Sequence, residues 1–131
     1  MTSPPETPVH VLYDEDCGFC KWSLDKILRW DRARRLRPVP IQSDEGARLL
    51  AGVPRELWLE SWHLSDSSGE VRSGGAAAAP LAALLPGGRP LAFLFRTFPR
   101  ATDRAYGWVA GNRDRLARLL RIDPNCRVRR P

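Results

Sequence analysis

The sequence predicts an α/β domain in which a central mixed sheet of about four strands is flanked by helices, with an extra C-terminal helix. Three observations predict this class. A strand, a helix, a second strand and a second helix follow one another from Val9, and two strands joined by a helix form a parallel pair through a right-handed crossover. Residues 61–73 then have the pattern of a hairpin, which adds antiparallel strands. Helical patterns fill the chain after the hairpin.

The first strand and the helix after it have clear patterns. The apolar segment VHVLY at residues 9–13 predicts a strand, and the polar run Asp14-Glu15-Asp16 ends it with a turn. A helical pattern begins at Cys17 and continues to about Arg32. Its apolar stripe consists of Cys20, Leu24, Ile27 and Leu28. We expect Asp16 to cap the start of this helix.

The middle of the chain predicts an edge strand, a short helix and the hairpin. Residues 36–41, LRPVPI, alternate as in a strand, and two prolines restrict this strand to a bent or edge position. Ser43-Asp44 is expected to cap a helix over residues 45–51, which ends at a glycine. The hairpin over residues 61–73 turns at the segment DSSG, whereas residues 54–60 have no clear pattern.

The last third of the chain is predicted to be mainly helical. An Ala-rich helix is expected over residues 76–85, after Gly74-Gly75 and before a Pro-Gly-Gly stop. Residues 91–95 are apolar, and Pro99 breaks whatever element precedes it. The final amphipathic helix is expected over residues 106–120.

The length of 131 residues is that of one ordinary domain. We expect the domain to span residues 9–122, with a flexible tail at residues 1–8 and a basic tail at residues 123–131. No segment reaches the roughly 18 consecutive apolar residues of a membrane span, and the N-terminus lacks the features of a secretory signal. The expected compartment is the cytoplasm, where three cysteines do not suggest a framework of structural disulfides.

The formal net charge is +6, from 21 basic and 15 acidic residues. A basic chain suggests nucleic acid or an anionic membrane as a partner. However, all the basic residues except Lys21 and Lys26 are arginines, and apart from short runs they are scattered. This pattern indicates a compositional bias of the whole chain, so the sequence disfavours both nucleic acid and a membrane as partners.

The segment Cys17-Gly18-Phe19-Cys20 carries the predicted chemistry. It follows a strand and opens a helix, which is the context of a redox-active Cys-x-x-Cys pair. Unpaired N–H groups and the helix dipole favour a thiolate at Cys17, and the thiolate is the attacking species in disulfide exchange. Cys20 lies one turn further on the apolar stripe, so we expect it to be the more buried thiol and to resolve the mixed disulfide.

Two other interpretations of the cysteine pair remain open. The cysteines could be unrelated reduced thiols, or they could form half of a zinc site, which usually needs four nitrogen or sulfur ligands. The remaining candidate ligands are His10, His63 and Cys126, each isolated along the chain, so no metal site is predicted. Dithiol exchange requires no organic cofactor, and none is expected.

Three further residues have alternative roles. Asp14 is a candidate proton acceptor for the resolving thiol if the turn folds it beneath the pair, and otherwise a residue that stabilises the turn. The acidic residues before Cys17 would also raise the pKa of its thiol. His63 lies on a predicted strand and is expected to be a core or surface residue rather than a base. Cys126 lies in the basic tail and is expected to be a free thiol.

These residues together resemble a known family. Tyr13-Asp14-x-x-Cys17-x-x-Cys20 after an apolar strand is similar to the signature of the DCC family of predicted thiol-disulfide oxidoreductases. The resemblance continues through Pro40-Ile41-Gln42-Ser43, through Gly74-Gly75-x-Ala77 after the hairpin, and through Tyr106-Gly107-Trp108-Val109-Ala110-x-Asn112-Arg113. It covers about residues 9–120.

The resemblance implies a thioredoxin-like fold with Asp14, Cys17 and Cys20 as signature positions. Thioredoxins place a cis-proline just before the third strand, facing the cysteine pair, whereas here Ser61 and Trp62 occupy that region. Arg113 matches a family position, but the sequence assigns it no chemical role.

The sequence therefore predicts a thiol-disulfide oxidoreductase in which Cys17 attacks and Cys20 resolves. Its expected partner is a protein or small-molecule disulfide or dithiol, and its expected oligomeric state is a monomer or a weak dimer. The alternative is a non-catalytic thioredoxin-like adaptor that binds a protein and in which the cysteine pair is incidental.

Overall fold

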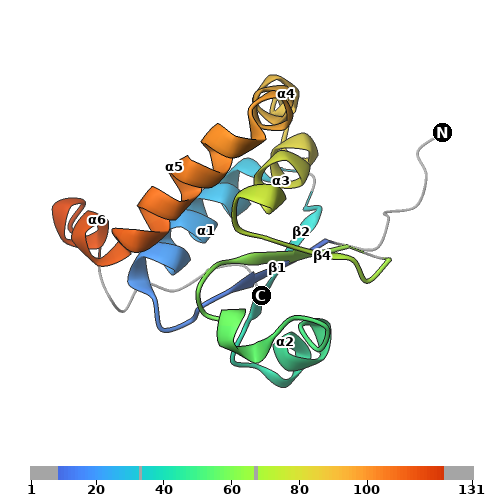
Figure 1. Ribbon diagram of the computed structural model, residues 1–131, viewed down its shortest axis with the longest axis vertical. Helices are drawn as coiled ribbons and strands as arrows, with labels where there is room; N and C mark the ends of the chain where they lie inside the picture. The colour runs from blue at the N-terminus through green and yellow to red at the C-terminus, as the bar shows by residue number, and fades with distance from the viewer. Residues whose placement is uncertain (1–8, 33, 67, 123–131) are drawn as a thin grey trace.

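A four-stranded mixed sheet forms the centre of the molecule (Figure 1). The structure is a computed structural model that describes residues 9–32, 34–66 and 68–122. The strands are β1 (Val9–Tyr13), β2 (Leu36–Pro40), β3 (His63–Ser65) and β4 (Val71–Ser73). They lie in the order β2-β1-β3-β4, with β1 parallel to β2 and antiparallel to β3, which is antiparallel to β4. The predicted tails at residues 1–8 and 123–131 lie outside the described residues.

Helices cover both faces of the sheet. In Figure 1, α2 lies on one side of the sheet, and α1, α3 and α5 lie on the other. The helices are α1 (Gly18–Trp30), α2 (Asp44–Leu49), α3 (Ala78–Leu84), α4 (Arg89–Thr97), α5 (Pro99–Gly111) and α6 (Arg113–Leu119). Two short 3₁₀ helices are η1 (Arg55–Leu57) and η2 (Gly74–Ala77). No helix in the described ranges has both the length and the apolar character needed to cross a bilayer.

Alternation along β1 builds two hydrophobic cores, one on each face of the sheet. Val11 faces the core beneath α1 and α3, and the adjacent Leu12 faces the core beneath α2. The buried members of the first core are Val11, Leu24, Leu28, Leu36, Leu64, Ala77, Leu81 and Leu85. Those of the second core are Leu12, Val39, Ile41 and Leu50. Leu24 and Leu28 come from the predicted apolar stripe of α1, so that stripe fixes the helix on the sheet.

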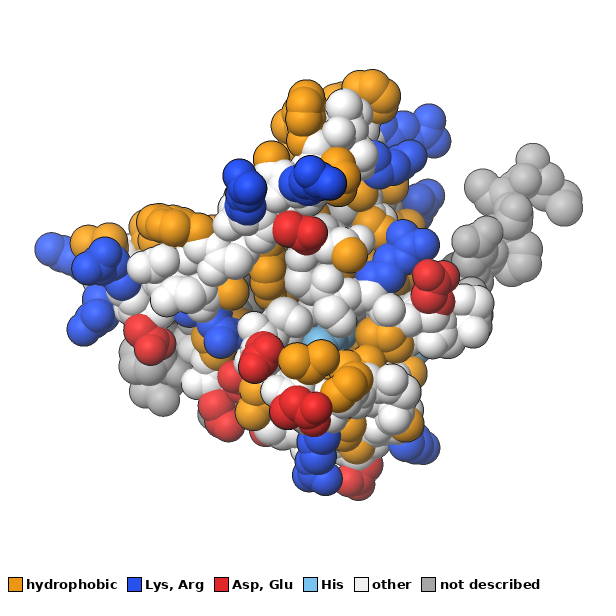
Figure 2. Space-filling model, in the orientation of Figure 1, with side chains coloured by type: hydrophobic (Ala, Val, Ile, Leu, Met, Phe, Trp, Pro, Cys, Tyr) orange, Lys and Arg blue, Asp and Glu red, His pale blue; other side chains and the backbone are white. Residues whose placement is uncertain are grey.

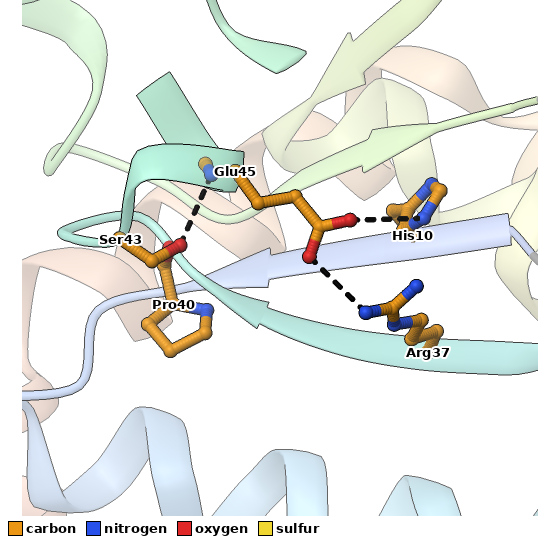
Figure 3. Close-up of polar contacts among 6 residues, drawn as sticks. His10, Arg37, Pro40, Ser43 and Glu45 are labelled. Atoms are coloured by element: carbon orange, nitrogen blue, oxygen red, sulfur yellow. Dashed lines mark hydrogen bonds and ion pairs between the residues drawn. The ribbon is translucent and has the colours of Figure 1, made fainter. Parts of the chain in front are cut away.

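Polar contacts attach α2 to the other face (Figure 3). Ser43 caps the helix, because its Oγ accepts a hydrogen bond from the Gly46 N–H at 3.0 Å. The Glu45 carboxylate lies 3.3 Å from Arg37 Nη2 on β2 and 3.8 Å from His10 Nε2 on β1. One carboxylate therefore connects the helix to the two parallel strands.

The predicted α/β class is confirmed, with the mixed sheet and the arrangement expected of a thioredoxin-like fold. The prolines of β2 fit its edge position. The prediction of one final helix over residues 106–120 is wrong in its bounds: the helical segment begins at Pro99 and divides at Asn112. The apolar residues 91–95 lie within α4, and the first turn of the Ala-rich segment is 3₁₀ rather than α-helical.

Candidate active site

Cys17 occupies the N-cap of α1, directly after the turn that leaves β1. Its backbone is extended, and its Sγ accepts a hydrogen bond from the Cys20 N–H at 3.3 Å. The sulfur thus has the place that a serine or aspartate oxygen usually has at a helix start. The prediction that Asp16 caps this helix is wrong, because the turn brings the following residue to the cap position.

Cys20 lies one turn further along α1 and deeper than Cys17. Both cysteines are free thiols and partly buried. The guanidinium of Arg113 approaches the pair from α6, and its Nη1 donates a hydrogen bond to Cys20 Sγ at 3.4 Å. The fold therefore brings α6, from the C-terminal part of the domain, into contact with Cys20 on α1.

The two thiols have opposite proton affinities. Hydrogen bonds from the Cys20 thiol and backbone N–H, together with the charge of Arg113, lower the pKa of Cys17 to about 6 against the opposing effects of burial and Asp14. The pKa of Cys20 is raised, because its proton is shared with Cys17, it is buried, and it lies beside the Cys17 charge. Arg113 opposes this increase. At neutral pH the Cys17 sulfur is the thiolate, and the deeper Cys20 sulfur keeps its proton.

Arg113 is the residue at the candidate site to which the sequence assigned no role. It is the first residue of α6, and its Nε donates to the Ala110 carbonyl at 3.1 Å. Burial disfavours the charged guanidinium, but the sulfurs of Cys20 and Cys17 raise the pKa of Arg113 overall. Its place in the family-like segment that ends Asn112-Arg113 was the available signal.

Asp14 lies in the turn before Cys17. Its Oδ1 accepts hydrogen bonds from Gln42 Nε2 at 2.7 Å and from the Asp16 N–H at 2.9 Å. Gln42 Oε1 in turn accepts from the Glu15 N–H at 3.2 Å. Gln42 therefore ties the turn to the loop after β2, and the Asp14 carboxylate is held by this loop rather than by either sulfur.

Two cavities flank the cysteine pair. On the Cys17 side, an open groove of about 700 Å³ runs between the β1–α1 turn and α6. On the Cys20 side, an apolar pocket of about 270 Å³ lies between α1, β1 and α5. Phe19 and Arg113 line both cavities. Cys17 thus lines a groove that is open to a ligand, and Cys20 borders an apolar pocket.

Ser61 and Trp62 precede β3, where thioredoxins have their cis-proline. No peptide bond within the described ranges is cis. Here the Trp62 N–H donates to the Tyr106 hydroxyl at 3.0 Å, and both side chains line the apolar pocket. Burial raises the pKa of Tyr106. A hydrogen bond from the backbone just before β3 to a side chain of α5 therefore stands at this position.

The other predicted residues lie away from the pair. His63 is fully buried, with its ring nitrogens 2.6 Å from Ser73 Oγ and 2.9 Å from the Trp58 carbonyl oxygen. Burial lowers its pKa, so it is a neutral core residue. Cys126 lies outside the described residues. Within the described part of the chain, no group of three or more potential ligands could hold a metal ion.

Comparisons with known proteins place the chain in one family. The family model described as DCC1-like thiol-disulfide oxidoreductase matches residues 11–119. No curated protein and no solved structure shows significant similarity to the chain. The matched segment contains both cysteines, Asp14 and Arg113.

Proposed function

Because the chain belongs to the DCC1-like thiol-disulfide oxidoreductase family, we propose that it exchanges dithiols and disulfides through Cys17 and Cys20. Cys17 is the attacking thiol, and Cys20 is the resolving thiol. The substrate is a protein or small-molecule disulfide, or a dithiol when the reaction runs in reverse. A reducing compartment such as the cytoplasm would hold the pair as the dithiol.

The observation that carries this proposal is the difference between the two thiols. The pKa of Cys17 is lowered to about 6, whereas the pKa of Cys20 is raised. An attacking thiol needs a large thiolate fraction at ambient pH and access to its substrate. Cys17 lines the open groove, so it has both properties.

In the proposed reaction, the Cys17 thiolate attacks one sulfur of the substrate, the substrate S–S bond breaks, and a mixed disulfide forms. The first substrate thiolate leaves and takes a proton from water. Cys20 then attacks Cys17 Sγ, which forms the Cys17–Cys20 disulfide, and the second substrate thiolate leaves with the proton that Cys20 loses. Two electrons pass to the substrate, and an external dithiol restores the pair by the reverse steps.

Arg113 and Asp14 have supporting roles in this proposal. The Arg113 guanidinium, 3.4 Å from Cys20 Sγ, favours the Cys20 thiolate that must form in the second step. Asp14 holds the turn through Gln42, and its charge keeps the pKa of Cys17 from falling further. A proton-acceptor role for Asp14 would require its carboxylate to leave Gln42 for Cys20 during resolution.

The test is exchange with bis(2-hydroxyethyl) disulfide and with a protein disulfide, with dithiothreitol as the reductant. We expect Cys17→Ser to reduce the rate to the uncatalysed background. In reactions without dithiothreitol, which would cleave it, Cys20→Ser should accumulate a mixed disulfide, visible as a substrate adduct on Cys17 by intact mass. The matched control is Cys126→Ser, which removes the third thiol and should leave the rate within about twofold. Exchange that survives Cys17→Ser would refute the assignment of roles.

The adaptor alternative has a separate outcome. If neither disulfide reacts above background and a protein partner binds equally to the wild type and to Cys17→Ser/Cys20→Ser, the pair is incidental. Equilibration in glutathione redox buffers, followed by alkylation with a mass tag, gives an independent measurement. A redox pair converts as one two-electron couple, whereas incidental thiols react independently.

A further inference from the structure

The groove beside Cys17 has two walls of opposite charge. One wall is α6 with its C-terminal turn, which contributes Arg118 and Arg121. The other is the β1–α1 turn, which contributes Asp14 and Asp16. Figure 2 shows basic side chains gathered over the α6 end of the molecule. The attacking sulfur lies between the two walls, so any disulfide that reaches it passes both.

The arginines of the first wall are available to a ligand. Arg113 is engaged with Cys20, but Arg118 and Arg121 are exposed and have no ion-pair partner among the described residues. Arg121 has a φ of 55°, a backbone position after a helix where glycine is favoured. The Ile122 N–H bonds to the Ala117 carbonyl across it at 2.9 Å. An arginine in this position costs backbone strain, and its side chain lines the groove.

The second wall supplies the opposite charge at short range from the sulfur. Asp16 is exposed and immediately precedes Cys17. Its backbone N–H, not its carboxylate, is used in the turn, where it bonds to Asp14 Oδ1. Among the described residues the Asp16 carboxylate has no ion-pair partner, so it can meet a cation. Asp114 on α6 offsets part of the positive charge of the first wall, which keeps the groove bipolar rather than simply basic.

The groove has the size of a small-molecule site. Its volume of about 700 Å³ lies within the roughly 300–1,000 Å³ of typical ligand pockets. Its lining includes apolar or small residues, among them Phe19, Ala110, Gly111, Ala117 and Ile122. A ligand with an apolar, sulfur-bearing middle and charged ends of both signs fits this surface.

We propose that the groove selects small zwitterionic disulfides, those of amino acids or short peptides that carry both carboxylate and ammonium groups. This inference rests on the proposed function and names the substrate class for the same site. The carboxylates pair with Arg118 and Arg121, and the ammonium group pairs with Asp16. These contacts hold the disulfide bond at Cys17, and exchange then follows the balanced steps given above.

The test uses fully reduced protein in single-turnover reactions, so that no second reductant is present. The probes are oxidised glutathione (zwitterionic), 3,3′-dithiodipropionate (carboxylates only), cystamine (ammonium groups only) and bis(2-hydroxyethyl) disulfide (neutral). Each rate constant is divided by that of the same probe with a free small thiol, which removes differences in intrinsic reactivity. We expect oxidised glutathione to have the highest ratio.

The decisive variant is Arg118→Gln/Arg121→Gln. It should lower the ratio for oxidised glutathione and dithiodipropionate by about tenfold, the effect of losing two partly exposed ion pairs. The ratio for the neutral disulfide should stay within about twofold. The matched control is Arg100→Gln/Arg104→Gln, which removes the same charge from a part of α5 that does not line the groove. Asp16→Asn should lower the ratio for cystamine but not for dithiodipropionate.

Four outcomes would overturn the inference. Equal effects of the two double variants would show that net charge, not the groove, matters. A neutral probe with a ratio as high as that of oxidised glutathione would show no selection. A protein disulfide that reacts at Cys17 while all four small probes do not would refute the substrate class and leave the proposed function intact. If no substrate reacts, the protein disulfide included, both the substrate class and the proposed function are refuted.

Discussion

At the scale of single residues, the chemistry of the pair depends on how one proton is divided between two sulfurs. Cys17 Sγ receives hydrogen bonds from the thiol and the N–H of Cys20, and Arg113 adds a positive charge. Burial and Asp14 act in the opposite direction. The favourable contacts prevail, because hydrogen bonds to a charged group are stronger than bonds between neutral groups.

The first residue-scale prediction concerns the pH dependence of Cys17. Its alkylation rate, measured with iodoacetamide and mass spectrometry in the Cys126→Ser background, should rise with pH to a plateau. The midpoint should lie at about 6, because only the thiolate reacts. Cys20 should remain unmodified throughout neutral pH, since its pKa is raised. A midpoint above 8 would contradict the hydrogen bonding described for the pair.

Two substitutions that remove charges of opposite sign serve as controls for each other in this titration. Arg113→Gln removes a positive charge that lowers the pKa of Cys17, so the midpoint should move to higher pH. Asp14→Asn removes a negative charge that raises it, so the midpoint should move to lower pH. Movement of both midpoints in the same direction would indicate a structural change rather than electrostatics.

At the scale of elements, the joint between β2 and α2 depends on one glycine. A Cβ added at Gly46 would collide with the Pro40 carbonyl oxygen and would lie 2.8 Å from that of Ile41. The absence of a side chain therefore lets the first turn of α2 pack directly on the end of β2. Because Gln42 connects the same loop to Asp14, this joint also supports the turn before Cys17.

Gly46→Ala should consequently lower the free energy of unfolding by about 1–3 kcal/mol, the usual effect of overpacking. The matched control is Gly52→Ala, where an added Cβ meets nothing within 4 Å and the change should be within about 0.5 kcal/mol. Urea denaturation of the reduced proteins measures both. Equal stabilities of the two variants would show that the helix can move away from the strand at little cost.

At the scale of the whole molecule, the thiolate couples redox state to stability. A thiol whose pKa is lower in the folded than in the unfolded chain stabilises the fold above its unfolded pKa, and this contribution is lost as the pH falls through the folded pKa. For Cys17 the contribution falls progressively between its ordinary pKa of 9.0 and its folded pKa of about 6, and it is absent at lower pH. The oxidised protein has no thiolate and lacks this contribution.

The reduced protein should therefore gain stability relative to the oxidised protein between pH 5 and pH 8. After a discount for the partial exposure of Cys17, the difference in Tm, reduced minus oxidised, should increase by about 2–6 °C. Differential scanning calorimetry of both forms checks this, because other titrating groups cancel in the difference. Added reductant should not change the Tm of Cys17→Ser/Cys20→Ser. A difference that stays flat or falls with pH would contradict the lowered pKa.

Local patterns predicted most of the fold. The apolar segment at residues 9–13 and the apolar stripe of α1 define the strand and the buried helical face on which the two cores depend. The prolines of β2 and the serine cap of α2 also act locally, so their structural consequences could be inferred from neighbouring residues. The position of the cap at Cys17 could not, because Asp16 and Cys17 compete for it and the path of the turn decides.

The sequence by itself determined the α/β order, the parallel crossover and the cysteine pair at a strand-to-helix junction, because these depend on spacings of a few residues. Only the tertiary structure decided that the helical segment divides at Asn112, which brings Arg113 onto the sulfur of Cys20, 93 positions away in the chain. It likewise decided the pairing of Gln42 with Asp14 and the groove between the first turn and α6. Contacts between distant segments form only when the sheet and both cores assemble, so no local pattern encodes them.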